Sequence, residues 1–156
     1  GITALVGSNP AAHSLNVSVA GSALKVSTDD FKREIMGGDG GVQQSLLAYA
    51  GEYITQIAQR SACAVFHIVQ QRFAVWLLLL EDRIEEDVIH ITQEQIAEHL
   101  GVRRAGVTVV AGAMQALGAI AYRRGNLRVN NRQMIEAMAC ECYGTLAVGR
   151  HETTYM

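Results

Sequence analysis

Residues 92–110 constrain the fold of this chain more than any other segment. Thr92 and Gln95 have the spacing of a capping box, in which two side chains pair the free backbone groups at the start of a helix. Gly101 is expected to end this helix, because glycine adopts a left-handed backbone conformation at no steric cost. A second helix is expected almost at once, and the small side chain of Ala97 lets it cross the first helix closely. The pattern predicts a helix-turn-helix of the kind that reads DNA.

A β-hairpin is predicted directly after the second helix. Residues 120–122 and 127–129 alternate in polarity, and Gly125 permits the turn between them. Arg123 and Arg124 then lie at the hairpin tip, where they can contact phosphate oxygens beside a DNA groove. A solvated hairpin tip is the alternative for these two arginines, and their place next to a helix-turn-helix favours phosphate contact. The hairpin and the two helices together predict a winged helix-turn-helix.

The charge distribution supports a DNA-binding role for this segment. The net charge of the chain is -2, so a DNA-binding surface has to come from local clustering of basic residues. Between residues 91 and 132, two glutamates stand against six arginines, which are Arg103, Arg104, Arg123, Arg124, Arg128 and Arg132. An ordinary helical hairpin inside a core would not need Arg103 and Arg104 at the start of its second helix. The charges therefore favour a DNA-binding winged helix-turn-helix over residues 92–129.

A long helix is predicted over residues 42–69, which contain no proline. Apolar and small residues recur along it at alternating steps of three and four, as in the seam of a coiled coil. We expect a dimerisation helix whose seam consists of Leu47, Ala50, Ile54, Ile57, Ser61, Ala64 and Ile68. The alternative is a core helix of a monomeric domain.

Shorter elements are predicted on both sides of the long helix. Residues 14–26 alternate as two strands of an antiparallel hairpin, and Ser27 or Thr28 then caps a short helix that ends at the glycine cluster 37–41. After the long helix, a further helix is expected to end near the acidic block 81–87, with an apolar face formed by Phe73, Trp76, Leu77 and Leu80. We interpret the acidic block as a solvated helix end or a surface that contacts a partner protein.

A last helix is predicted after the hairpin. Asn130 or Asn131 is expected to cap it, and it is expected to run to about Cys142.

Over nearly all of its length the chain resembles the Crp/Fnr family of bacterial transcription regulators. The resemblance is clearest in residues 91–97, in residues 100–104 and in the hairpin. It implies an α+β fold with a partial β-roll, a long dimerisation helix and then a winged helix-turn-helix DNA-binding domain. Residues 1–41 would be the remainder of a cyclic-nucleotide-binding-like β-roll that lacks its front strands. Residues 42–70 would be the dimerisation helix, 71–145 the DNA-binding domain and 146–156 a flexible tail.

The same resemblance implies roles for individual residues. Arg104 would read a guanine edge, while Arg103, Thr92 and Arg123 would lie near phosphates. The full set of expected DNA contacts is Thr92, Gln93, Arg103, Arg104, Ala105, Thr108, Val109, Arg123 and Arg124. The cyclic-AMP regulator of the family carries Arg-Glu-Thr-Val and a second arginine at the positions of residues 104–107 and Val109. Because this chain lacks that acidic reader and that second basic reader, we expect a different operator, with a hydroxyl or apolar contacts from Thr108, Ala105 and Val109.

The resemblance also bears on the effector and the partners. Cyclic-nucleotide binders of the family use a Glu after a Gly and an Arg-Ser pair, where this chain has Ile2 and His13. We therefore expect no cyclic AMP, no cofactor and an effector of unknown identity. The expected partners are double-stranded DNA, a second copy of the chain and RNA polymerase. The longest apolar run, residues 74–80, is too short to cross a membrane, and three cysteines fit a reducing cytosol, so we expect a cytoplasmic protein.

The cysteines and histidines leave one alternative open. Cys140 and Cys142, with a histidine from elsewhere, have donors suited to a soft metal. Neighbours that close on a continuous helix diverge by about 200 degrees, so both can bind one ion only if the helix ends there. Apolar packing without a metal is the favoured interpretation, also for Cys63, and no set of residues predicts an enzyme. The alternative function is a ligand- or metal-responsive dimeric interaction module with weak, non-specific DNA binding.

Overall fold

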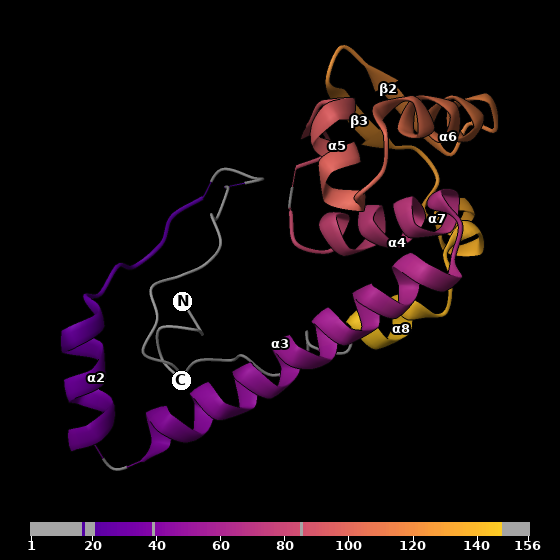
Figure 1. Ribbon diagram of the computed structural model, residues 1–156. Helices are drawn as coiled ribbons and strands as arrows, with labels where there is room; N and C mark the ends of the chain where they lie inside the picture. The colour runs from indigo at the N-terminus through magenta and orange to yellow at the C-terminus, as the bar shows by residue number, and fades with distance from the viewer. Residues whose placement is uncertain (1–16, 18–20, 39, 85, 148–156) are drawn as a thin grey trace. The chain divides into compact units, whose positions relative to one another are not determined.

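The computed structural model describes residue 17 and residues 21–38, 40–84 and 86–147 (Figure 1). The chain forms two compact units, residues 1–55 and residues 56–156. The order of the described elements is α2, α3, α4, β1, α5, α6, β2, β3, α7 and α8, which confirms the α+β class. None of the described helices is long and apolar enough to cross a membrane.

The first unit contains helix α2, Thr28–Gly37, and the first part of the long helix α3. The predicted cap of α2 is confirmed, because the Ser27 side chain accepts a hydrogen bond from the Asp30 backbone at 3.1 Å. The predicted second strand of the hairpin is wrong, since residues 21–27 form no strand and Leu24 and Val26 are exposed. A two-stranded hairpin that packs on nothing is only marginally stable in water. The first strand, apart from Val17, lies outside the described residues, as do Ile2 and His13.

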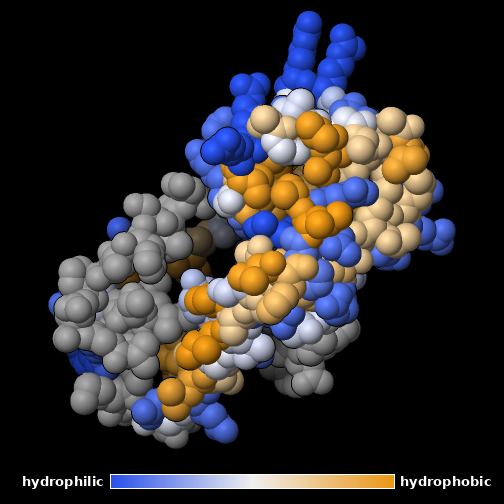
Figure 2. All heavy atoms as spheres, turned by 45° about the vertical axis from the view of Figure 1, so that its right-hand side comes forward, coloured by the Kyte–Doolittle hydropathy of each residue, from blue (hydrophilic) through white to orange (hydrophobic). Residues whose placement is uncertain are grey.

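Helix α3, Gly41–Phe66, confirms the predicted long helix and ends slightly earlier than expected. Ile68 adopts an extended conformation and is the N-cap of the next helix, so it does not continue the α3 seam as predicted. Large apolar side chains of the seam are exposed, with relative accessibilities of 60% for Leu47, 65% for Ile54 and 48% for Ile57. Figure 2 shows this apolar character as orange atoms along the long helix.

The core of the second unit is built around helix α4, Val69–Glu81. All residues from Phe73 to Leu79 are buried, because α5 and α6 cover one part of the helix and α7 and α8 another (Figure 1). Phe73 stacks on Trp76 with ring centroids 5.9 Å apart. The core continues into the helix-turn-helix and the hairpin through Ile96, Val107, Met114, Ile120, Leu127 and Ile135.

A three-stranded antiparallel sheet follows, in the order β1-β3-β2. Its strands are β1, Ile89–His90, β2, Ile120–Arg123, and β3, Asn126–Val129. Strands β2 and β3 are the predicted hairpin, with Ile120 opposite Val129 and Arg123 opposite Asn126. Strand β1 was not predicted, because two residues are too few to show an alternating pattern.

The C-terminal segment forms two helices where the sequence predicted one. Asn131 caps α7, Arg132–Met138, by accepting from the Met134 backbone at 3.1 Å. Ala139 is extended, and a second helix, α8, covers Cys142–Ala147. The predicted single helix to Cys142 and the predicted tail from residue 146 are therefore wrong at these positions. The tertiary reason is that α8 packs on α4 through Leu146.

Replacing Gly112 by alanine is expected to raise the free energy of unfolding by about 1 kcal/mol. Gly112 is exposed in the interior of α6, Arg104–Ala116, and a methyl group there would meet no atom within 4 Å. The matched control is Gly101→Ala, expected to destabilise because the φ angle of Gly101 is +63°. Urea denaturation of the three proteins measures both changes. A destabilising Gly112→Ala would mean that this glycine has a structural role.

Candidate nucleic-acid interface

Helices α5, Gln93–Leu100, and α6 meet at the predicted corner. The capping box is formed as expected, with Thr92 Oγ1 accepting from the Gln95 backbone at 3.2 Å and Gln95 Oε1 accepting from the Thr92 backbone at 2.9 Å. Gly101 is left-handed, and the Val102 backbone donates to the Ala97 carbonyl at 3.0 Å. Ile96, Ala97, Leu100 and Val107 are buried at the corner. This packing holds the start of α6 in a defined direction.

The exposed face of α6 carries most of the predicted DNA-contacting residues. Arg103 is the N-cap of α6 and Arg104 its first residue, and both are exposed. Ala105, Thr108 and Val109 are also exposed, and their spacing places them with Arg104 on one side of the helix. Val109 is 72% accessible, so it presents an apolar side chain on this face. An exposed apolar side chain here suits contact with a partner surface.

Gln93 is tied to this face by a hydrogen bond. The Thr108 hydroxyl donates to Gln93 Oε1 at 2.7 Å, and it also lies 3.2 Å from the Arg104 carbonyl. The amide NH2 group of Gln93 is therefore oriented by Thr108. The sequence did not show this contact, because the two residues are on different helices.

The β2–β3 hairpin presents Arg123 and Arg124 at its turn, and both are exposed. Arg124 and Gly125 both have positive φ angles, 51° and 81°, as the central residues of a two-residue type I′ turn require. In Figure 2, blue hydrophilic side chains project from the top of the molecule, where Figure 1 places this hairpin.

Contacts through Ile91 and Tyr122 hold the hairpin beside the helix-turn-helix. The Ile91 backbone donates to the Gly125 carbonyl at 2.8 Å, and the Tyr122 hydroxyl donates to the Ile91 carbonyl at 2.9 Å. Gln115 of α6 donates to the Tyr122 carbonyl at 3.2 Å. Burial raises the pKa of Tyr122, and the positive charge of Arg104 acts in the opposite direction. The hairpin turn, the start of α5 and the start of α6 therefore belong to one surface.

Neither Arg132 nor His99 contributes a positive charge to this surface. Arg132 pairs with Glu81, Asp82 and Glu136 at 2.8 to 2.9 Å, so it holds α7 to the end of α4. The acidic block thus has an intramolecular partner at its first two residues, which the sequence did not indicate. Burial, together with the positive charge of Arg60, lowers the pKa of His99 to about 4, so His99 is neutral near pH 7.

Arg72 is a structural residue that the sequence analysis missed. Its guanidinium donates to the Leu100 carbonyl at the end of α5. Arg72 lies on α4, 28 residues earlier in the chain, so no local pattern indicates the contact.

Comparisons with known proteins bear on the identity of this domain. Residues 71–138 match the family model of the Crp-like helix-turn-helix domain. The chain is similar in structure to FixK2 from Bradyrhizobium japonicum, with a TM-score of 0.67 and 16% identity over 74% of this chain and 60% of that one. It is also similar to a transcriptional regulator described as a member of the Crp/Fnr family from Eubacterium rectale, with a TM-score of 0.57 and 19% identity over 71% of this chain and 51% of that one. Residues 71–138 are therefore a Crp-like helix-turn-helix domain, and the chain shares the fold of these two proteins.

The chain spans 60% and 51% of the lengths of the two solved structures. The TM-scores show a common fold. Because the identities are low, the roles of individual residues have to be inferred from this chain itself. A search of curated proteins found no similar sequence.

Proposed function

We propose that this chain is a sequence-specific transcription regulator of the Crp/Fnr type that binds an inverted-repeat operator as a homodimer. The observation that carries the proposal is the continuous exposed surface formed by the start of α6 and the hairpin turn, with four arginines on it. A helix-turn-helix places such a helix in the major groove, with residues near its N-terminus at the base edges.

The chemistry of the surface assigns a role to each group of residues. Arg104 has the donors for a bidentate contact to guanine, and Ala105 and Val109 suit the methyl group of thymine. Thr108 adds a hydroxyl whose proton is directed at Gln93. Thr92, Gln93, Arg103, Arg123 and Arg124 surround this reading face and suit contacts to phosphates, which fix the position of the protein on the duplex.

The exposed seam of α3 supports the homodimer. Leu47, Ile54 and Ile57 are each about half exposed or more. Small seam residues lie among and after them, at Ala50, Ser61 and Ala64. A second copy of the same helix would bury this stripe in a coiled coil. Two recognition helices would then meet half-sites about one DNA turn, roughly 34 Å, apart. Ile68 is not part of the α3 seam, so the proposed seam ends at Ala64.

The partners proposed for the protein are double-stranded DNA, a second copy and RNA polymerase, in the cytoplasm. The effector is unassigned, and Ile2 and His13 argue against cyclic AMP, because neither supplies the carboxylate or the arginine of the family's nucleotide cassette.

Selection of binding sites from a random DNA pool tests the proposal, followed by a salt titration on the selected site. We expect an inverted repeat with half-sites about one turn apart, bound by two copies of the chain in sedimentation. Recovery of no motif, with weak binding that falls steeply with salt, would contradict sequence-specific reading. That outcome would favour the interaction module with non-specific DNA binding.

A further inference from the structure

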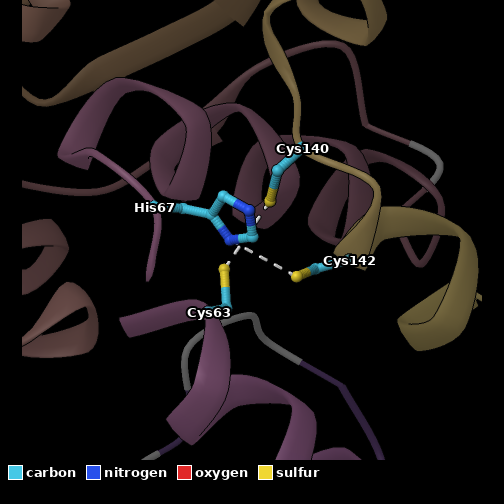
Figure 3. Close-up of side chains that lie close together, drawn as sticks. All are labelled: Cys63, His67, Cys140 and Cys142. Atoms are coloured by element: carbon cyan, nitrogen blue, oxygen red, sulfur yellow. Dashed lines mark hydrogen bonds between the residues drawn. The ribbon is translucent and has the colours of Figure 1, made fainter. Parts of the chain in front are cut away.

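Four side chains with metal-binding donors converge outside the proposed DNA surface. Cys63 lies in the last turn of α3, His67 directly follows α3, Cys140 lies between α7 and α8, and Cys142 begins α8. Their sulfur and nitrogen atoms all lie within 4.8 Å of one another, and Figure 3 shows them pointing toward a common centre. The three cysteines are buried and reduced, and His67 is half-buried.

Local structure explains how the end of α3 and the link between α7 and α8 each supply two metal-binding donors. Cys63 and His67 are one helical turn apart, and the His67 backbone still donates to the Cys63 carbonyl at 3.1 Å. On the other side, α7 ends at Met138 and the chain runs extended through Ala139. Because the helix is interrupted there, Cys140 and Cys142 can face the same point, which they could not do on a continuous helix.

We propose that Cys63, His67, Cys140 and Cys142 bind one Zn²⁺ ion in a tetrahedral site. Zinc–sulfur bonds of about 2.3 Å and zinc–nitrogen bonds of about 2.0 Å, at tetrahedral angles, separate two sulfurs by about 3.8 Å and a sulfur from a nitrogen by about 3.5 Å. Cys63 Sγ and Cys140 Sγ are 3.7 Å apart, and Cys142 Sγ and His67 Nδ1 are 3.6 Å apart. These separations fit a single ion, and they exceed a disulfide bond of about 2.05 Å.

Two neighbouring side chains, Glu141 and Gln59, form hydrogen bonds to the proposed ligands, as the groups around a metal site usually do. Glu141 Oε1 lies 3.2 Å from His67 Nε2, so it can accept that proton and leave Nδ1 for the ion. Gln59 Nε2 donates a hydrogen bond to Cys142 Sγ at 3.0 Å, which holds this sulfur in place. Closed Cys3His sets of this kind are structural zinc sites. The ion would hold the end of α3 to the link between α7 and α8, within the unit that carries the helix-turn-helix. The site does not depend on the proposed DNA binding.

Metal titration of the full chain tests the site. The reduced protein is freed of metal with a chelator and titrated with Zn²⁺ against a chromophoric chelator. Co²⁺ is the spectroscopic probe, because its visible spectrum reports tetrahedral coordination and its thiolate charge-transfer bands report the sulfur ligands. We expect one ion per chain, with Zn²⁺ displacing Co²⁺.

Variants separate the site from adventitious binding. Cys142→Ser is expected to remove tight binding, and His67→Gln, which keeps all three thiols, is expected to weaken it and shift the Co²⁺ spectrum. Glu141→Gln is expected to lower the affinity roughly 10- to 100-fold. His90→Gln is the matched histidine control, because His90 lies in β1 beside Asn126, and it is expected to bind as the parent does.

Three outcomes would overturn the proposal. The first is the absence of one-to-one binding in the parent chain. The second is equal binding by the parent and His67→Gln with an unchanged spectrum, which would remove His67 as a ligand even if Cys142→Ser fails to fold. The third is protein that carries two or more irons with sulfide, which would assign these cysteines to an iron–sulfur cluster.

Discussion

Replacing Arg132 by alanine is expected to lower the free energy of unfolding by about 2 to 3 kcal/mol, below the 3 to 5 kcal/mol typical of a fully buried pair. Arg132 Nη2 lies 2.8 Å from Asp82, whose side chain is only 5% accessible, and Nη1 lies 2.8 Å from Glu81. Without the guanidinium, Asp82 keeps the Tyr143 hydroxyl at 2.9 Å but loses its ion pair with Arg132. The value is reduced because the Arg132 side chain is 38% accessible, so water screens part of the interaction.

Urea denaturation at pH 7 measures this loss, and Glu136→Gln is the matched control. Glu136 pairs with the same arginine at 2.9 Å, but the pair is exposed and lies within one helix, so its removal should cost about 0.5 kcal/mol or less. Equal small effects of both variants would show that the contact between α4 and α7 does not depend on the buried carboxylate.

Replacing Arg104 by alanine is expected to weaken binding to the selected operator by about 1 to 3 kcal/mol, or roughly 5- to 150-fold, and to relax the preference at one base pair. Arg104 is the first residue of α6 and exposed, which is where a recognition helix meets base edges. Arg123→Ala should weaken binding to all DNA sequences about equally and reduce the slope of log affinity against log salt concentration by about 1. The reason is that Arg123 lies at the hairpin turn and suits a phosphate contact.

Binding of each variant to the selected site and to random DNA, over a range of salt concentrations, distinguishes the two roles. Arg33→Ala is the charge-matched control, because Arg33 is exposed on α2 and paired with Asp30. Arg104→Ala and Arg123→Ala losing the same affinity on both DNAs would contradict the division between base and phosphate contacts.

The helix-turn-helix was predictable because its determinants are local in sequence. The capping box spans residues 92–95, Gly101 acts through its own backbone conformation, and the hairpin turn depends on Arg124 and Gly125. Each feature uses hydrogen bonds or sterics among residues at most a few positions apart, so the linear pattern contains them. The second strand of the hairpin predicted over residues 14–26 shows the limit of that reasoning, since alternation alone does not make a strand and Leu24 and Val26 are exposed.

What the sequence determined by itself is the set of local elements around residues 92–129 and the exposed α3 stripe, because periodicity, caps and turns act over short distances. Only the tertiary structure decided which distant side chains meet. Cys63 and Cys140 are 77 positions apart, and Arg132 reaches Asp82 across 50. These contacts exist because α7 and α8 pack on α4 and the chain breaks its helix at Ala139, and the packing of a shared core leaves no periodic signal in the sequence.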